Sequence, residues 1–402
     1  MDGVLSAARD VDWSRLDGRI LCPACLGRLF GKIGHGYSNE ARGRAVQEFV
    51  AAESGACWVC DGLTSRYDDL ADLVVRKLES WEFATFRLGS RIDPEVASRE
   101  EALWAELSLT GPEPLRAEFN REVGKRVSER VRKEPGLEHP DVVAVVDPSF
   151  DHVDLQVNPL YLRGRYRKLV RGIPQTRWPC RRCQGKGCAR CGGTGKMYAT
   201  SVEEVIAAEV MRDIGGSGHA LHGMGREDVD ARMLGRGRPF ILEIKEPRKR
   251  PADFTDAIGR VNASGLVEVD SLARATGADI VTLKEDRAAK TYRVLLACSP
   301  PVDEAKLKTS LQVFGREPIA QRTPERVVHR RADTTRTRRL LSAEVVSVEE
   351  DRAEIRVTAE AGTYIKEWVH GDHGRTRPSL AERLETACAV LELDVLDVHD
   401  DR

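Results

Sequence analysis

A glycine-rich stretch of acids and arginines is the part of this sequence most able to do chemistry. Residues 225–240, GREDVDARMLGRGRPF, hold three carboxylates, four arginines and three glycines. The pattern predicts an amphipathic helix just before this stretch, over 201–214, and a short buried strand just after it, over 240–244. A loop between packed elements that holds an acid beside a polyanion is a candidate active site, and a solvated turn stitched by ion pairs is the alternative.

Two further segments place aromatic rings beside cations. The stretch 361–370 reads AGTYIKEWVH, and on a strand Tyr364 and Lys366 would share one face. The stretch 290–293 reads KTYR and opens the predicted strand 292–298. Together with the carboxylates, these rings and cations would make a pocket for a nucleobase, although a half-buried strand aromatic is the plainer interpretation of either tyrosine alone.

Four segments, in this order, resemble the tRNA pseudouridine synthases of the Pus-ten family in its archaeal form: GREDVDARMLGRGRPF, KTYRVLLACSP, QRTPERVVHRRAD and AGTYIKEWVHGDHGRTRPSL. Arg226-Glu227-Asp228 resembles the Arg-x-Asp that carries the invariant aspartate of other pseudouridine synthases. The string from Gly362 to Lys366 is similar to the glycine, threonine, tyrosine, isoleucine, arginine string of the bacterial tRNA pseudouridine-55 synthases, with lysine in place of arginine. The resemblance covers nearly the whole chain.

The resemblance implies an isomerase that turns uridine into pseudouridine in the TΨC arm of tRNA, at position 54, position 55 or both. The base must be flipped out, detached from its ribose, turned and rejoined through carbon, so no cofactor for catalysis is expected. Asp228 is the implied catalytic carboxylate, acting covalently or by moving a proton, and Asp230 is its rival. Lys366 would keep Asp228 ionised, and Tyr292 and Tyr364 would hold the base.

Nucleic acid would be held by local basic patches, because the chain is almost neutral overall, with 63 basic and 64 acidic residues. Residues 321–340 carry seven arginines and two acids, 163–172 carry five basic residues and no acid, and 245–250 reads KEPRKR. Such patches usually form a solvated face, but three of them suit phosphate contacts. The cations expected to bind RNA are Arg226, Arg165, Lys168, Arg330 and Arg331.

Eight of the ten cysteines form four C-x-x-C pairs: Cys22 and Cys25, Cys57 and Cys60, Cys180 and Cys183, Cys188 and Cys191. Four thiolates at such spacings suit tetrahedral zinc. Disulfides are the alternative, but a chain without a signal peptide is expected to be cytoplasmic, where thiols stay reduced. The first two pairs predict a structural zinc site. The last two form a compact basic cluster, expected to act as a hinge and to touch phosphate; zinc binding there and crossed pairing between the clusters stay open.

Two other classes of protein fit part of the sequence. C-x-x-C-x-G-x-G occurs twice in the second cluster, as in the cysteine-rich module of DnaJ-type chaperones, and the chain contains His139-Pro140-Asp141. In a J domain that tripeptide would join two helices, whereas here it precedes VVAVV, a predicted strand. A zinc-containing RNA-binding protein with an inert carboxylate loop is the second alternative.

The chain is long enough for several domains, and its fold class is predicted as multidomain α+β. Helices over 39–53, 67–81 and 113–134 and strands over 82–92, 142–148 and 152–164 are expected in its first half. No apolar run approaches the roughly 20 residues that cross a bilayer, so no membrane partner is expected, and a monomer is the default. The predicted domains are an N-terminal zinc module (1–65), a THUMP-like RNA-binding domain (66–176) whose RNA-facing end is 161–176, the cysteine hinge (177–195), and a catalytic domain with a mixed antiparallel sheet (196–402).

Overall fold

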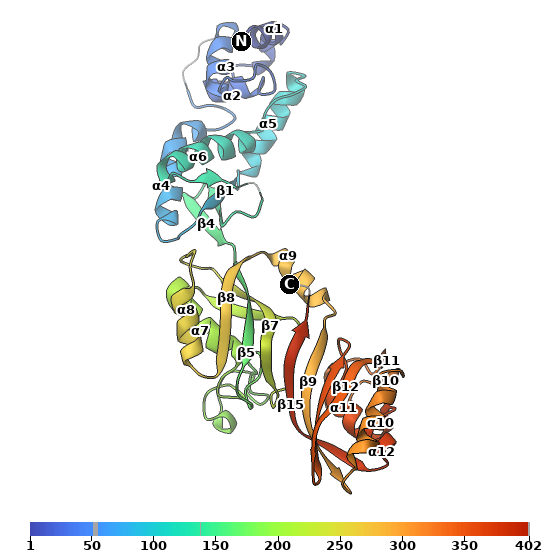
Figure 1. Cartoon of the computed structure of the whole chain (residues 1–402). Coiled ribbons are helices and arrows are strands. Elements are labelled where there is room, and N and C mark those ends of the chain that lie inside the picture. The colour runs from blue at the N-terminus through green and yellow to red at the C-terminus, as the bar shows by residue number, and fades with distance from the viewer. Residues whose placement is uncertain (51–54, 137, 401–402) are drawn as a thin grey trace. The chain divides into compact units, whose positions relative to one another are not determined.

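The protein consists of two compact units in a computed structural model that describes residues 1–50, 55–136 and 138–400 (Figure 1). Unit 1 comprises Met1–Pro159 together with Glu246–Arg250, and unit 2 comprises Leu160–Lys245 and Pro251–Arg402. Each unit has its own hydrophobic core of buried side chains. The two units are therefore described one at a time.

Unit 1 begins with a small helical module. Its helices are α1 (Asp2–Arg9), α2 (Pro23–Arg28) and α3 (Asn39–Val46). Helices α2 and α3 touch backbone to backbone, because a Cβ at Gly27 or at Gly43 would lie 1.7 Å from a carbonyl oxygen of the other helix. The predicted helix over 39–53 is shorter in the structure, since α3 ends at Val46, and residues 51–53 lie outside the described part of the chain. The Ser38 hydroxyl caps α3 by accepting a bond from the Ala41 amide at 3.1 Å.

The rest of unit 1 is a four-stranded sheet covered by helices. The helices are α4 (Tyr67–Leu78), α5 (Pro94–Glu106) and α6 (Leu115–Val131), and the strands are β1 (Thr85–Ser90), β2 (Glu134–Pro135), β3 (Val142–Asp147) and β4 (His152–Val157). The strand order is β2-β1-β3-β4, with β1 parallel to β3. Strand β3 starts directly after Asp141, so the His-Pro-Asp tripeptide precedes a strand, as predicted, and joins no pair of helices.

Unit 2 is built on an eight-stranded sheet in the order β12-β13-β9-β15-β7-β5-β8, with β6 added against β7. Its strands are β5 (Leu160–Lys168), β6 (Gly218–Gly223), β7 (Arg232–Lys245), β8 (Val267–Ala275), β9 (Ala289–Ser299), β12 (Leu340–Glu349), β13 (Arg352–Ala359) and β15 (Ala387–His399). Neighbours are antiparallel except β15 and β7, which are parallel. The predicted mixed antiparallel sheet is confirmed.

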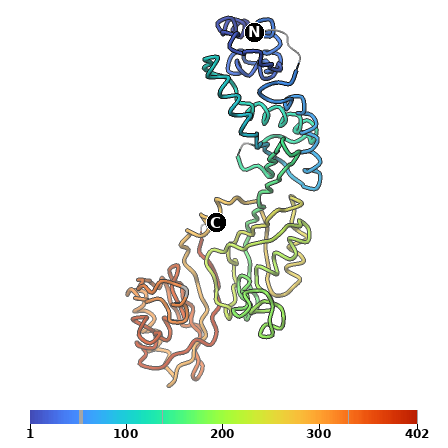
Figure 2. The backbone as a smooth tube through the Cα atoms, turned by 180° about the vertical axis from the view of Figure 1, so that it is seen from behind, coloured from blue at the N-terminus to red at the C-terminus, as the bar shows by residue number. Residues whose placement is uncertain are grey.

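Helices lie at both ends of this sheet, as Figures 1 and 2 show from opposite sides. Beside β8 are α7 (Val202–Ile214) and α8 (Thr255–Ala263); α9 (Gly277–Glu285) follows β8; and towards β12 are α10 (Glu304–Phe314), α11 (Ile365–His370) and α12 (Leu380–Leu384). A second small sheet, β11-β10-β14, is formed by β10 (Ile319–Arg322), β11 (Thr335–Arg338) and β14 (Thr376–Arg377). Helix α7 matches its predicted span, with the Ser201 hydroxyl as its cap.

The structure divides the chain earlier than the predicted boundary at residue 176. Strand β5 pairs with β7 on one side and with β8 on the other, so residues 160–168 lie inside the sheet of unit 2 instead of ending the accessory domain. The second cysteine cluster lies between β5 and α7, both in unit 2, so it is not a hinge between the units. Residues 246–250 are counted with unit 1, where the Arg248 guanidinium lies 3.7 Å from the centre of the Trp81 ring.

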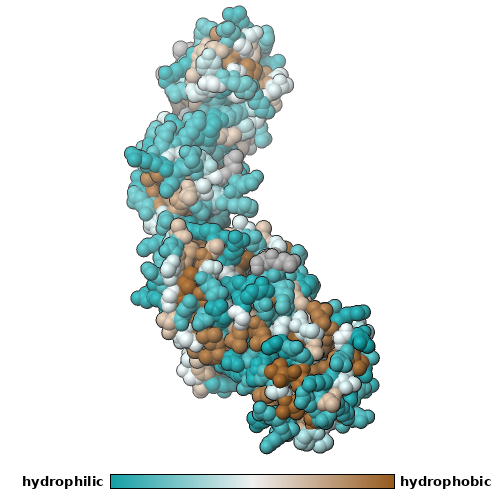
Figure 3. All heavy atoms as spheres, in the orientation of Figure 1, coloured by the Kyte–Doolittle hydropathy of each residue, from teal (hydrophilic) through white to brown (hydrophobic). Residues whose placement is uncertain are grey.

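No helix among the described residues is both long and apolar enough to cross a membrane. The space-filling view in Figure 3 shows mostly hydrophilic side chains over unit 1 and patches of hydrophobic ones over unit 2. Large apolar side chains exposed on unit 2 include Val281, Val328, Leu341, Val346 and Leu391.

Candidate active site

The acidic stretch forms a short loop followed by a long strand. The loop covers 225–231, and β7 begins at Arg232, so the strand is much longer than the predicted span of 240–244. Pairing with β5 overrides the glycine-rich composition, with a bulge between the pairs Tyr166–Arg238 and Lys168–Met233. Glycine is needed at Gly235, where φ is +58° and a Cβ would lie 1.8 Å from a carbonyl oxygen.

Glu227 anchors the loop to strands β5 and β7. Its side chain is fully buried, its two oxygens lie 3.0 and 2.8 Å from the Tyr166 hydroxyl that donates to the carboxylate, and it pairs with Arg238 at 2.8 Å. The Lys168 ammonium, also fully buried, donates to the backbone carbonyls of Ile173 and Asp228 at 2.9 and 3.0 Å. This buried network fixes the backbone that carries Asp228.

Asp228 lines a cavity of about 220 Å³. Its carboxylate accepts a bond from the Arg326 guanidinium at 3.0 Å and lies 3.6 Å from the Lys366 ammonium. Of the residues predicted to form the site, six line this cavity: Arg226, Asp228, Tyr292, Arg331, Tyr364 and Lys366. The structure thus brings together side chains as far apart in the chain as Asp228 and Lys366.

Lys366 makes its closer ion pair with the rival carboxylate. Its ammonium lies 2.7 Å from Asp230 and 3.6 Å from Asp228. Partial burial opposes ionisation of Asp230, but the bonds from Lys366 outweigh it and lower the pKa of Asp230 below its ordinary value. The expected pairing of Lys366 with Asp228 is thus secondary in this structure, and Arg326 holds the closer position.

Two tyrosines enclose the cavity. Tyr292 on β9 is 9% exposed, and burial raises its pKa to about 12, so its phenol stays neutral. The Tyr364 hydroxyl accepts a bond from Arg331 at 2.8 Å. A cavity with two aromatic faces and a carboxylate has the chemistry to hold a flat, neutral base beside an acid.

The alternating pattern suggested that Tyr364 and Lys366 lie on a strand, but the structure shows that they do not. Lys366 is in α11, and Tyr364 is its N-cap residue. The helix forms because Trp368 is fully buried in the core, and it ends at Gly371, whose φ of +82° only glycine adopts easily. Both side chains nevertheless line the cavity.

Two of the cations predicted to bind RNA serve the protein itself. Lys168 is fully buried, so it cannot contact a phosphate, and burial lowers its pKa. Arg165 pairs with the buried carboxylate of Asp400 at 2.8 Å and donates to the backbone carbonyl of Arg236 at 2.9 Å. The side chain of Arg330 lies outside the described part of the structure.

Sequence reasoning missed three cations that line the cavity: Arg238, Lys290 and Arg326. Arg326 bridges Asp228 and the buried Glu367, at 3.0 and 2.6 Å. Lys290 also lines the cavity; burial, with the nearby charge of Arg238, lowers its pKa to about 8. Lys290 opens the KTYR segment, so its place beside Tyr292 was a usable signal, whereas Arg326 is one of seven arginines in its patch.

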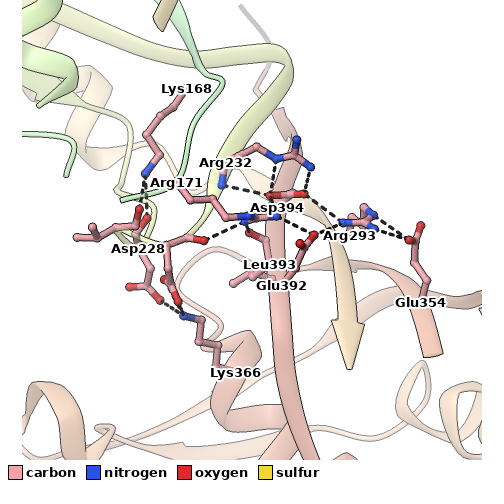
Figure 4. A network of polar contacts seen from close by, with 12 residues as sticks. Lys168, Arg171, Asp228, Arg232, Arg293, Glu354, Lys366, Glu392, Leu393 and Asp394 are labelled. Carbon is pink, nitrogen blue, oxygen red and sulfur yellow. Dashed lines mark hydrogen bonds and ion pairs between the residues drawn. The ribbon is translucent and has the colours of Figure 1, made fainter. Parts of the chain in front are cut away.

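A second network fixes the far end of the loop (Figure 4). Asp394 on β15 is fully buried and pairs with Arg171 at 2.8 Å and with Arg232 at 2.7 Å. Arg171 also donates to the backbone carbonyl of Asp230 at 2.9 Å. The loop is therefore held by Lys168 at Asp228, by Arg171 at Asp230 and by Lys366 at the Asp230 carboxylate.

Both cysteine clusters have geometry that suits a tetrahedral metal. In each set, Cys22, Cys25, Cys57 and Cys60 or Cys180, Cys183, Cys188 and Cys191, the four sulfurs lie within 4.8 Å of one another. Sulfurs about 2.3 Å from a central zinc ion would lie about 3.8 Å apart. The Cys22–Cys60 distance is 3.7 Å and the Cys180–Cys188 distance is 3.9 Å. Each cluster is complete in itself, without crossed pairing.

Family models match both units. Residues 161–399 match the model described as Pus10, C-terminal, and residues 70–147 match the one described as Pus10 THUMP domain, archaeal. A protein named tRNA pseudouridine synthase Pus10 from Methanothrix thermoacetophila is 41% identical, over 94% of this chain and 91% of its own length. The protein of that name from Pyrococcus furiosus is 38% identical, over 99% of this chain and 98% of its own length.

A weaker likeness exists among solved structures. A Cbf5-Nop10-Gar1 complex matches at a TM-score of 0.31 and 21% identity, covering 49% of this chain and 45% of that chain.

The match over unit 2 and the similarity to these relatives define the class of protein as a pseudouridine synthase, an isomerase. Among these enzymes, the chain belongs to the Pus10 family. The THUMP domain in unit 1 is confirmed, with a matched span of 70–147.

Proposed function

We propose that this chain converts uridine to pseudouridine in the TΨC arm of tRNA, at position 54, position 55 or both. The observation that carries the proposal is the convergence of Asp228, Tyr292 and Tyr364 on one cavity lined by cations. The similarity to relatives named tRNA pseudouridine synthase supports tRNA as the substrate. The THUMP domain supports RNA binding by unit 1.

Asp228 is the proposed reacting carboxylate. Its neighbours Arg326, at 3.0 Å, and Lys366, at 3.6 Å, orient it, so it can act on the ribose or base covalently, or take and return a proton. Asp230 is the weaker candidate because its side chain is 67% exposed and is already paired with Lys366 at 2.7 Å. In this arrangement Lys366 links the two carboxylates and positions the loop.

The cavity walls hold the flipped base. Tyr292 offers a buried, neutral ring, and a stacked base gains about 1–3 kcal/mol from such a face. Tyr364, fixed by Arg331, closes the opposite side against base or ribose. A base detached from its ribose must stay in this enclosure while it turns, so that its C5 can replace N1 at the sugar.

We further propose that both cysteine clusters bind zinc as structural sites. Four-thiolate ligation leaves no open coordination position, so the metal takes no part in the isomerisation. Zinc would hold its own hairpin or helical module in place. Metal analysis of the purified protein tests this directly, with two zinc ions per chain as the expected content.

The test of the proposed function is tritium release from an unmodified tRNA transcript labelled at C5 of uridine. Forming the new bond at C5 expels that hydrogen, so release counts the turnovers. We expect release by the unaltered chain and a loss of about 10²- to 10⁴-fold or more in Asp228→Asn. The matched control is Asp230→Asn, which should keep most of the rate. Carbodiimide mapping of the product then locates the modified position.

A non-catalytic RNA-binding protein is the competing interpretation. It predicts tight tRNA binding without tritium release by the unaltered chain. Equal losses in Asp228→Asn and Asp230→Asn would instead overturn the assignment of Asp228 as the sole reacting group.

A further inference from the structure

The Asp228 loop is also the wall of a second hollow. This hollow, of about 200 Å³, is lined on one side by Pro174, Gln175 and Trp178. It shares five lining residues with the cavity described above: Arg226, Glu227, Asp228, Arg326 and Lys366. A ligand in the second hollow, here called the Trp178 hollow, would therefore lie next to a uracil held beside Asp228.

Trp178 is held at the place where the two ends of the segment that carries the second cysteine cluster meet, here called the neck of the cluster. Its carbonyl accepts a bond from the Met197 amide at 2.9 Å, and the next residue, Pro179, pairs with Lys196 across the neck. The Tyr198 ring packs edge-on against the Trp178 ring with centroids 5.5 Å apart. The Arg226 guanidinium lies over the same indole, 5.4 Å from its centroid. The tryptophan is thus oriented by the hairpin and joined to the catalytic loop.

The hairpin that carries Trp178 is strongly basic. Residues 177–196 contain six lysines and arginines and no acid. A zinc ion with four thiolates carries two negative charges, which leaves this segment about +4. The side chains of Arg181, Arg182, Lys186 and Arg190 are exposed. Such a surface attracts a phosphate backbone.

The hollow itself suits a neutral base better than a phosphate. Its charged lining residues are three carboxylates, Glu227, Asp228 and Asp230, and three cations, Arg226, Arg326 and Lys366, so it offers no net positive charge to attract an anion. A neutral base needs no such charge and can stack on an aromatic ring or on an arginine plane. The exposed cations of the hairpin remain available to bind the phosphates.

We propose that the Trp178 hollow binds the unpaired base directly next to the target uridine, while the cysteine hairpin holds the adjoining phosphates. The inference deepens the proposed function and rests on it, because the neighbouring base is defined by a uridine at Asp228. The second cysteine cluster then belongs to the substrate site, and Trp178 selects RNA whose neighbouring nucleotide is free to unstack.

The test is a double-mutant cycle on binding affinity, with the full chain and a TΨC stem-loop RNA. Removing the base on one side of the target, by an abasic nucleotide, should weaken binding to the unaltered chain on the order of tenfold. Trp178→Leu should weaken binding of the intact RNA by a similar factor. The two changes together should cost no more than either alone, because both remove the same stack.

The controls separate stacking from folding. Trp178→Phe keeps an aromatic face and should recover part of the affinity, and zinc content and melting temperature show whether each variant folds. Trp104→Leu removes a partly buried tryptophan from unit 1 and should show no coupling to the abasic site. An abasic nucleotide far from the target is the matching control in the RNA.

The inference would be overturned if the losses of binding free energy from Trp178→Leu and from the abasic nucleotide were additive. This holds for an abasic nucleotide on either side of the target. The cycle measures binding alone, so it reports on the hollow even where tritium release fails. Coupling without tritium release would support base binding in the Trp178 hollow and contradict the proposed catalytic activity. Tritium release without coupling would support the catalytic activity and contradict base binding in the hollow.

Discussion

The two cysteine clusters use the same ligands in opposite surroundings. In unit 1, Cys25, Cys57 and Cys60 are buried, and the Arg28 guanidinium, 2% exposed, donates to the Cys25 sulfur at 3.0 Å. In the cluster of unit 2, Cys180 is buried while Cys183, Cys188 and Cys191 are partly exposed, and the cations around the cluster face solvent.

The difference shows that ligand spacing alone does not define the role of a metal site. Arg28 connects the first cluster to α5 and α6 through Glu100 and Glu118, both buried, so that cluster is part of the core of unit 1. The second cluster has cations that face solvent, and it lies beside Trp178, whose ring contacts Arg226 of the Asp228 loop. We therefore expect the first to control folding and the second to control substrate binding.

The largest effect should come from removing a ligand of the first cluster. Cys57→Ser should cost unit 1 more than about 5 kcal/mol, because the metal contributes directly to the free energy of folding. Hydrogen exchange measured by mass spectrometry would show loss of protection in peptides from unit 1 and retained protection in unit 2. Cys298→Ala, a buried cysteine outside both clusters, is the control and should leave unit 1 protected.

Arg28→Met should have the next largest effect. It leaves Glu100 and Glu118 buried without their cation, a loss of about 3–5 kcal/mol in the free energy of unfolding. Arg44→Met, at an exposed ion pair with Glu40, should cost less than about 0.5 kcal/mol. Urea unfolding, followed by a signal from unit 1, compares the free energies of unfolding of the two variants. A small loss of stability in Arg28→Met would show that the first cysteine cluster is not coupled to α5 and α6.

The acid beside Arg28 predicts a pH dependence for unit 1. Burial, only partly offset by Arg28, raises the pKa of Glu118 from 4.5 to about 7. Between these values the folded state binds more protons than the unfolded state, so the Glu118 contribution, fully present below the lower pKa, is lost as pH rises to about 7. The full span is worth about 3 kcal/mol.

Glu118→Gln should flatten this slope, because the amide does not titrate. Unfolding measured with zinc in excess between about pH 5.5 and 7.5 keeps the thiolates metallated while Glu118 titrates. A slope unchanged by the substitution would mean that Arg28 keeps Glu118 ionised throughout.

The sequence predicted local features well. The loop around Asp228, the cysteine sets and helix α7 depend on residues close together in the chain, so spacing and periodicity were sufficient. Strand β5 was misplaced because its partners are 65 or more positions away, and pairing such as Tyr166 with Arg238 is set by the tertiary fold.

The pairing of charges at the site was beyond sequence reasoning for a related cause. Lys366 reaches Asp230 because α11 is a helix, a result of burying Trp368 that the short alternating pattern did not reveal. Arg326 could not be singled out from its arginine-rich patch, since composition gives the charge of a segment but not which guanidinium meets Asp228.

The smallest effect on stability should come from the second cluster, and it is the sharpest test of the comparison. Cys191→Ser should change the free energy of unfolding of unit 2 by less than about 1 kcal/mol, because a surface hairpin can open locally without disturbing the core. Binding of tRNA should nevertheless weaken, and the plot of log affinity against log salt should become shallower by about 0.7–0.9 for each phosphate that the hairpin no longer neutralises.

Cys57→Ser is the contrasting variant. It should leave unit 2 folded, and the hairpin should keep its salt-dependent binding of phosphates. If Cys191→Ser instead melted unit 2 with an unchanged salt slope, the second cluster would be a folding element like the first, and the distinction between a core metal site and a substrate-binding one would disappear.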